Sequence, residues 1–195
     1  MGYLLLVRHG ETEWSVSGQH SSWSDLPLTG HGEEQAKSLA PLLSGRTFSL
    51  ALTSPLHRAV RTAELAGVAG AVPDADLREW DYGGYEGVTT VEIHRTRPAW
   101  DLWTDGVAPG PDGHPGESPE EIGRRADRVL ARVDAALPEG DVILVAHAHF
   151  LRVLTARRLG LPPAEGRLFQ LATGTLSRLS TEHDRPVVAE WNVRA

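Results

Sequence analysis

The 195-residue chain contains no cysteine and only one methionine. Without cysteine, disulfide bonds, thiolate nucleophiles and zinc sites with thiolate ligands are excluded. The chain also lacks an apolar run that approaches the ~20 residues needed to span a bilayer. No charged-then-apolar leader precedes Tyr3. We therefore expect a cytoplasmic protein with no membrane partner.

An excess of positive charge is missing too. The chain carries 19 Lys and Arg against 26 Asp and Glu, a formal net charge of -7. A nucleic-acid partner is not expected, because phosphate backbones are bound through clustered basic side chains. Any anion that binds here needs a local basic pocket. The length fits one domain covering residues 1–195, and nothing in the sequence speaks against a homodimer.

Short apolar runs alternate with segments of helical period, a pattern typical of βαβ units. It predicts an α/β fold whose mainly parallel sheet is covered on both faces. The predicted strands are 3–8, 50–53, 142–146, 176–180 and 187–191.

The clearest helix is predicted over residues 119–137, with Ser118 as its cap and Glu121 completing a capping box. Pro41 indicates an early stop or a kink near the end of one further helix. The Gly- and Pro-rich stretch 104–118 is predicted to be an irregular loop. The remaining helices are predicted at 32–43, 56–66 and 151–159.

Three of the predicted strands are followed by basic or imidazole side chains. Arg8 and His9 follow the first, Arg58 lies shortly after the second, and His147 follows the third. Ligands of open α/β sheets bind in the crevice beyond the carboxyl ends of the strands. We therefore expect these side chains to converge on one site.

The charges at this site favour an anion over a metal. A divalent cation near Arg8 and Arg58 would be repelled by about 4 kcal/mol per unit charge pair at 4 Å, whereas a phosphate would be attracted. Arginine also offers planar, bidentate donors to phosphate oxygens, and Gly10 would let the backbone approach a ligand. The same positive field should keep His9 neutral and nucleophilic.

Expulsion of an alkoxide from phosphorus requires a proton donor. Glu79 is the candidate, because Trp80 and Tyr82 provide an apolar, aromatic setting that would keep a carboxylic acid protonated. The deprotonated group could then activate water. Asp81 and Glu86 are the competitors for this role.

Six segments resemble the histidine phosphatase superfamily, also called the phosphoglycerate-mutase-like family. In chain order they are "LLLVRHGETEW", "LPLTGHGEEQAKSLA", "TSPLHRAVRTAE", "LREWDYGGYEG", "GES" and "VAHAHFLRVLTARRLGLP". They follow the order and spacing of the family from about Leu4 to Pro162. The resemblance implies a three-layer α/β/α sandwich with a mainly parallel central sheet.

The resemblance also implies roles for individual residues. His9 would be the phosphorylated nucleophile, Arg8 and Arg58 phosphate ligands, His147 the second catalytic histidine, itself in contact with the phosphate, and Glu79 the proton donor. Neither a metal nor an organic cofactor is implied.

Four further residues are predicted to bind substrate. Ser15, Gln19 and Ser21 lie in the loop after the signature, although family members often carry Asn in place of Ser15. Arg152 would bind a second phosphate or polar end of the substrate, or else be an arginine on a helix surface. His149 lacks a carboxylate cluster, which favours a structural or substrate-shaping role over a metal site.

Within the family, "REWDYGGYEG" and "AHAHFLR" look most like acid phosphatases and sedoheptulose-bisphosphatase-like sugar phosphatases. The predicted function is hydrolysis of small phosphate monoesters, such as sugar phosphates or bisphosphates. The alternative is a cofactor-dependent phosphoglycerate mutase, which the short chain disfavours because little material is left to exclude water. A noncatalytic phospho-ligand module is a third hypothesis.

Overall fold

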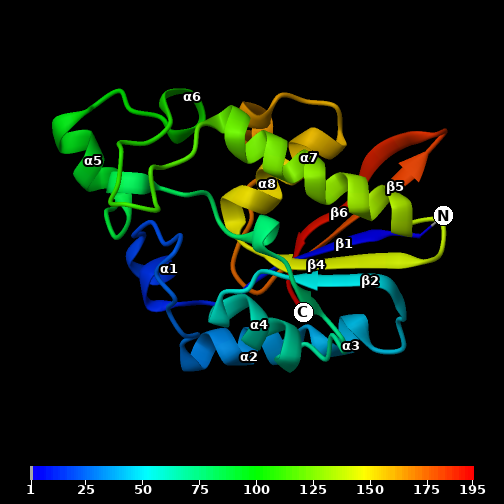
Figure 1. Ribbon diagram of the computed structural model, residues 1–195. Helices are drawn as coiled ribbons and strands as arrows, with labels where there is room; N and C mark the ends of the chain where they lie inside the picture. Colours follow the sequence, from blue (N-terminus) through cyan, green and yellow to red (C-terminus); the bar gives the residue numbers. More distant parts are fainter. Residues whose placement is uncertain (1) are drawn as a thin grey trace.

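The computed structural model describes residues 2–195 and contains a six-stranded sheet (Figure 1). The strand order is β3-β2-β4-β1-β5-β6. Strands β1 to β4 are parallel to one another, whereas β5 runs antiparallel to β1 and β6 antiparallel to β5. This confirms the predicted α/β class with a mainly parallel sheet. The strands are β1 Leu4–Arg8, β2 Phe48–Thr53, β3 Val72–Pro73, β4 Asp141–Ala146, β5 Leu176–Glu182 and β6 Arg185–Val193.

All five predicted strands are present, with differences at their ends. β5 and β6 are longer than predicted because they form a hairpin, whose turn residues His183 and Asp184 have φ of 48° and 60°. β3 was not predicted; it has only two residues, both exposed, so no apolar run marks it.

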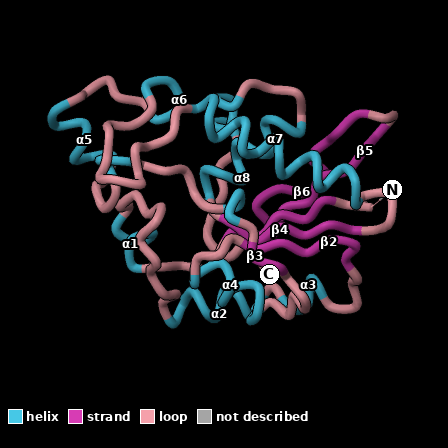
Figure 2. Tube along the Cα trace, in the orientation of Figure 1, coloured by secondary structure: helices cyan, strands magenta, loops and turns pink. Residues whose placement is uncertain are grey.

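The helices cover both faces of the sheet (Figure 2). As predicted, α7 follows a capping box made by Ser118 and Glu121. The single helix predicted at 32–43 is instead two helices that meet at Leu39. α8 begins three residues before the predicted start, directly after β4. The helices are α1 Glu13–Ser17, α2 Gly30–Ser38, α3 Ala40–Leu43, α4 His57–Leu65, α5 Thr90–Thr96, α6 Leu102–Asp105, α7 Pro119–Ala136 and α8 Ala148–Arg158.

Two separate apolar cores explain why the strands have continuous apolar sequences. In β1, Leu4 and Leu6 pack with α7 and α8, whereas Leu5 and Val7 pack with the residues of α3 and α4 on the other face. All four side chains are at most 1% exposed. A strand buried on both faces needs apolar residues at every position, so β1 sits in the middle layer of a three-layer sandwich.

Helices α1, α5 and α6 lie apart from these layers, beyond the carboxyl ends of β1, β2 and β4 (Figure 1). After α6, the chain from 106 to 117 is irregular, which agrees with most of the predicted loop. The parallel strands therefore open toward a region built from loops and short helices. Within residues 2–195, no helix has the length and apolar character required to cross a membrane.

Candidate active site

The carboxyl ends of three neighbouring parallel strands meet where the sequence predicted. Arg8 of β1 pairs with Ala146 of β4, and the His9 amide donates to the Ala146 carbonyl at 3.0 Å. His147 follows β4 directly, and the His9 and His147 rings lie 5.0 Å apart between centroids. On the other side of β4, the amide of Ser54 donates to the carbonyl of Val145 at 2.9 Å. The sheet thus brings two imidazoles and a hydroxyl together.

The orientation of the His9 ring is set by the backbone. Its Nδ1 lies 2.7 Å from the carbonyl oxygen of Gly10. A carbonyl can only accept, so Nδ1 carries the hydrogen and Nε2 keeps the lone pair. Burial holds the pKa of His9 well below its usual range, and the charges of Arg58 and Arg8 lower it further. The ring is therefore neutral at pH 7, with burial a larger cause than the arginines on which the prediction relied.

Gly10 has a different role from the one the sequence suggested. A Cβ on Gly10 would lie 2.2 Å from the carbonyl oxygen of Gly32, and a Cβ on Gly32 would lie 2.1 Å from the carbonyl oxygen of Glu11. Both glycines allow the loop after β1 to pack directly on the first turn of α2. The close approach is between two backbones, and it fixes the loop that carries His9.

Arg58 is fully buried, and all its side-chain nitrogens donate to neighbouring groups. Nε donates to Nδ1 of His147 at 3.3 Å. Nη1 donates to the carbonyl of Ser24 at 2.8 Å, and Nη2 to the carbonyls of Ser21 and Ser22 at 3.2 and 3.1 Å. Arg58 therefore ties α4 both to the second histidine and to the loop at 21–24.

His147 adopts the opposite tautomer to His9. Since its Nδ1 accepts from Arg58, its Nε2 carries the hydrogen and donates to Oγ of Ser54 at 2.7 Å. Burial and the charge of Arg58 hold the pKa of His147 well below its usual range. The second imidazole is thus a neutral N–H donor.

A cavity of about 220 Å³ opens in front of His9; we call it the nucleophile cavity. Six of the predicted site residues line it, namely Arg8, His9, Ser15, Gln19, Ser21 and Glu79. Trp14, His20, Tyr82 and Thr90 also line it and were not predicted. Of these, Trp14 and Tyr82 stood in quoted motifs.

Arg8 lines the nucleophile cavity and keeps a donor that no described residue accepts. Its Nη1 donates to the carbonyl of Leu171 at 2.6 Å, while its Nε is buried with no hydrogen-bond partner among the described residues. Burial lowers the pKa of Arg8 from its usual value, yet a guanidinium stays charged at neutral pH. An orphaned cationic donor beside His9 suits a phosphate oxygen.

Glu79 is 6% exposed, and backbone amides hold its carboxylate. Oε1 accepts from the amides of Trp80 and Phe150 at 2.9 and 2.8 Å, and Oε2 from the amide of His149 at 3.1 Å. The last two amides belong to the first turn of α8, where N–H groups lack partners within the helix. Trp80 is buried beside Glu79 as predicted, but the carboxylate itself sits among polar donors.

Neither competitor of Glu79 lines the nucleophile cavity. The carboxylate of Glu86 accepts from the amides of Ser22 and Ser24 at 2.9 to 3.0 Å. Asp81 accepts from the amide of Gly83 at 2.9 Å. Both carboxylates hold loops in place, which leaves Glu79 as the carboxylate that faces His9 across the cavity.

Two of the predicted substrate ligands use their polar atoms within the fold. The Ser15 hydroxyl belongs to the capping box of α1 with Thr12. The Gln19 amide nitrogen donates to the carbonyl of Gly87 at 2.8 Å, and its oxygen accepts from the hydroxyl of Ser17 at 2.7 Å. The hydroxyl hydrogen of Ser15 reaches a ligand only by exchanging its partner, whereas the amide nitrogen of Gln19 has a second N–H that no described residue accepts.

Three other predicted ligands, Arg58, His147 and Arg152, do not line the nucleophile cavity. The His147 ring lies 5.0 Å from that of His9 between centroids, and Arg58 donates to His147. Arg152 instead donates from Nε to the carbonyl of Gly166 and from Nη2 to that of Arg167, both at 3.0 Å. Its guanidinium also lies 4.6 Å from the ring centre of Trp103. Arg152 therefore does not reach the nucleophile cavity, because its guanidinium binds the backbone that follows α8.

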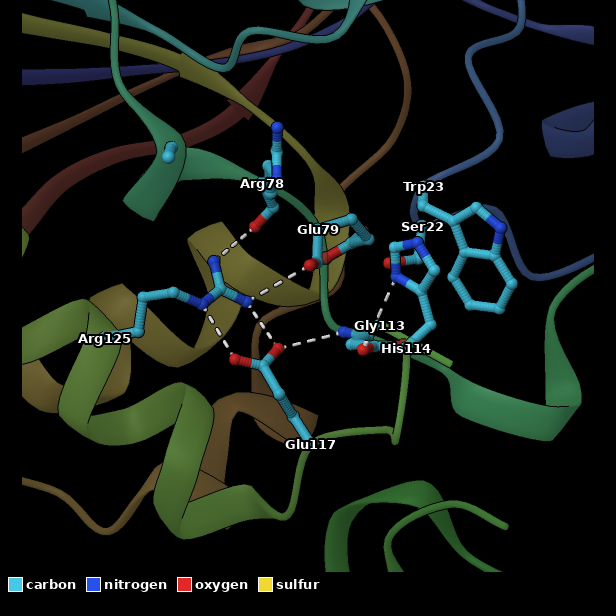
Figure 3. A pocket seen from close by; sticks show the side chains of 10 residues that line it. Ser22, Trp23, Arg78, Glu79, Gly113, His114, Glu117 and Arg125 are labelled. Atoms are coloured by element: carbon cyan, nitrogen blue, oxygen red, sulfur yellow. Dashed lines mark hydrogen bonds and ion pairs between the residues drawn. The ribbon is translucent and has the colours of Figure 1, made fainter. Parts of the chain in front are cut away.

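A second cavity, of about 250 Å³, lies beside Glu79 (Figure 3). Arg125 of α7 forms a bidentate ion pair with Glu117 at 2.9 and 2.6 Å and donates to the carbonyls of Arg78 and Glu79 (Figure 3). Glu117 also accepts from the amide of Asp81 at 2.9 Å. This pair fixes the backbone that carries Glu79. Glu117 belongs to the "GES" motif. The motif alone does not reveal that Glu117 holds this backbone, because its ion-pair partner Arg125 lies eight residues further along the chain, on α7.

Within residues 2–195, no cluster of three or more His, Asp or Glu side chains is arranged to hold a metal ion.

The ring of His149 forms part of the wall of the nucleophile cavity. Burial holds the pKa of His149 well below its usual range, and the charge of Arg152 lowers it further. Nδ1 of His149 lies 2.6 Å from the hydroxyl of Tyr82. His149 therefore shapes the cavity wall as a neutral ring.

Comparisons with known proteins agree with this geometry. The sequence model of the histidine phosphatase superfamily, branch 1, matches residues 4–194. An acid phosphatase of Mycobacterium tuberculosis is 37% identical, over 92% of this chain and 87% of its own. Sedoheptulose 1,7-bisphosphatase of Saccharomyces cerevisiae is 35% identical, over 80% of this chain and 67% of its own. The solved structure of an open reading frame product of Mycobacterium tuberculosis superposes with a TM-score of 0.92 at 36% identity, covering 99% and 98% of the two chains.

Proposed function

Because the chain belongs to branch 1 of the histidine phosphatase superfamily, we propose that it is a metal-independent phosphatase that forms a phosphohistidine at His9. Its substrates are small phosphate monoesters, in the range of sugar phosphates and bisphosphates. The observation that carries the proposal is the His9 ring: with Nδ1 bound to Gly10, Nε2 is the nitrogen left to attack phosphorus.

The first step transfers the phosphoryl group to the enzyme. Nε2 of His9 attacks phosphorus, the N–P bond forms, and the P–O bond to the alcohol breaks. The unused Nε of Arg8 donates to an equatorial oxygen, and the buried charge of Arg58 lies close behind. Glu79 gives its proton to the leaving oxygen.

The second step returns the histidine to its starting state. The Glu79 carboxylate accepts a proton from water, and the water oxygen attacks phosphorus as the N–P bond breaks. The amides of His149 and Phe150 hold the carboxylate during this step, since they stabilise its negative charge. Phosphate then leaves the nucleophile cavity.

The test is release of inorganic phosphate, with chelator present, from a panel of sugar phosphates, sugar bisphosphates and phosphoglycerates. We expect turnover by the unaltered chain and by His31→Gln, which changes an exposed histidine, and none by His9→Ala. Turnover that persists in His9→Ala refutes the phosphohistidine. Interconversion of phosphoglycerates without net phosphate release identifies a mutase instead.

The proposal extends to location and partners. We place the protein in the cytoplasm, where fractionation of cells should recover it with other phosphoester-metabolising enzymes. The partner is a small phosphate ester, with no nucleic acid, no membrane and no cofactor. Light scattering of the purified chain tests whether it forms a homodimer.

A further inference from the structure

An outer cavity of about 460 Å³ adjoins the nucleophile cavity. The two share His20, Thr90 and His149 as wall residues. The outer cavity is further lined by α6 and the chain before it, including Trp100, Asp101 and Trp103. When the phosphoryl group lies against His9, this space is available to the alcohol part of the substrate. Its lining therefore bears on which alcohols fit.

The lining of the outer cavity contains no lysine or arginine among the described residues, and its one carboxylate is Asp101. The imidazoles of His20 and His149 are neutral at pH 7, since burial lowers the pKa of His20 and lowers that of His149 well below its usual range. The Nε2–H of His94 donates to the carbonyl of Trp100 at 2.8 Å.

Arg152 does not reach this wall with a donor. Its guanidinium lies 4.6 Å from the ring centre of Trp103, and its Nε and Nη2 donate to the carbonyls of Gly166 and Arg167. A second phosphate or a carboxylate in the outer cavity would gain no arginine or lysine donor from the lining and would lie near the carboxylate of Asp101. Like charges at short range repel, so an anionic alcohol is disfavoured there.

The same wall suits an uncharged ring that carries hydroxyl groups. Trp100 and Trp103, 5% and 8% exposed, present aromatic surface. His20 lines both cavities, and its Nδ1 is buried without a close hydrogen-bond partner among residues 2–195, so a small shift of the ring would let it bond to a hydroxyl group. A buried polar atom without a partner is stabilised by a ligand that hydrogen-bonds to it.

We propose that the outer cavity selects monophosphate esters of uncharged alcohols with a ring or apolar face, such as neutral sugar monophosphates, and rejects bisphosphates and phosphorylated carboxylic acids. This inference rests on the proposed function and narrows its substrate class. It follows from the placement of two tryptophans, three imidazoles and one carboxylate around a space without a cation.

Two matched substrate pairs test the proposal in phosphate-release assays. The first pair is fructose 6-phosphate and fructose 1,6-bisphosphate; the second is glycerol 3-phosphate and 3-phosphoglycerate. We expect kcat/KM to favour the ester with the uncharged alcohol by at least about tenfold in each pair, the scale of one lost charged hydrogen bond. Equal or higher kcat/KM for the anionic members overturns the proposal.

A lysine placed in the wall provides a second readout. Ala99 lines the outer cavity and is exposed, so Ala99→Lys adds a cation there. In Ala99→Lys, the kcat/KM values of the two esters in each pair should lie closer together. Ala69→Lys, at an exposed position outside both cavities, should leave the ratio of the two kcat/KM values unchanged. If both variants give the same ratios, the wall charge does not set specificity and the proposal is wrong. If no ester releases phosphate at all, the proposed function fails, and this inference with it.

Discussion

The folded chain should lose stability in acid because it buries neutral histidines. Burial is the largest cause that holds the pKa of His9, His147 and His149 well below the ordinary 6.5. Below pH 6.5 the unfolded chain therefore binds protons that the folded chain does not bind. Stability is fully present above that pH and is lost as the pH falls.

The magnitude follows from proton linkage. A histidine that is protonated only in the unfolded chain costs about 2 kcal/mol of unfolding free energy between pH 7 and pH 5. These three groups together account for up to about 6 kcal/mol, and His20, whose pKa burial also lowers, adds to this loss. Since a domain is stable by about 5–15 kcal/mol, the loss is large enough to measure easily.

The assay is urea unfolding at pH 7 and pH 5 in a buffer free of phosphate. His149→Gln should reduce the acid-induced loss by up to about 2 kcal/mol, because one linked proton is gone. His31→Gln changes an exposed imidazole and should retain the full loss. An unfolding free energy that is the same at both pH values would refute the assignment of neutral, buried rings.

Three further variants test the site and its support. Glu79→Gln should lower kcat by about 10²–10⁴-fold, the usual contribution of general acid–base catalysis, with a near-normal rate speaking against Glu79. Gly32→Ala should destabilise the fold, because its Cβ would lie 2.1 Å from a backbone oxygen; Gly30→Ala, in open space on the same helix, should not, and equal thermal melts would contradict this. Ser54→Ala should lower kcat more than it raises KM, since Nε2 of His147 loses its acceptor; unchanged steady-state kinetics would exclude that role.

The sequence was most informative where local signals are strong. The apolar run before Arg8 and the run before His147 end abruptly, and parallel strands deliver their ends to the same edge of a sheet. The capping box at Ser118 likewise marks the start of α7. Each of these predictions depends on a few neighbouring residues and on one rule of packing.

The cavity walls depend on contacts between distant segments, which no local pattern encodes. The Glu86 carboxylate holds the amides of Ser22 and Ser24 from 64 and 62 positions away. Gln19 bonds to the carbonyl of Gly87, 68 positions away. These bonds position the loop so that His20 lines both cavities. The sequence shows only one histidine in a polar loop, which does not predict this position.

The two histidines at the sheet edge illustrate the same limit at the level of single atoms. In the sequence, His9 and His147 are equivalent: each follows a buried parallel strand. In the structure, the Gly10 carbonyl gives His9 an Nδ1–H, whereas the N–H of Arg58 makes Nδ1 of His147 an acceptor. One ring therefore presents a lone pair at Nε2 and the other an N–H, held by Ser54. The lone-pair ring and the N–H ring are distinguished by their partners, because the residue type alone allows both tautomers.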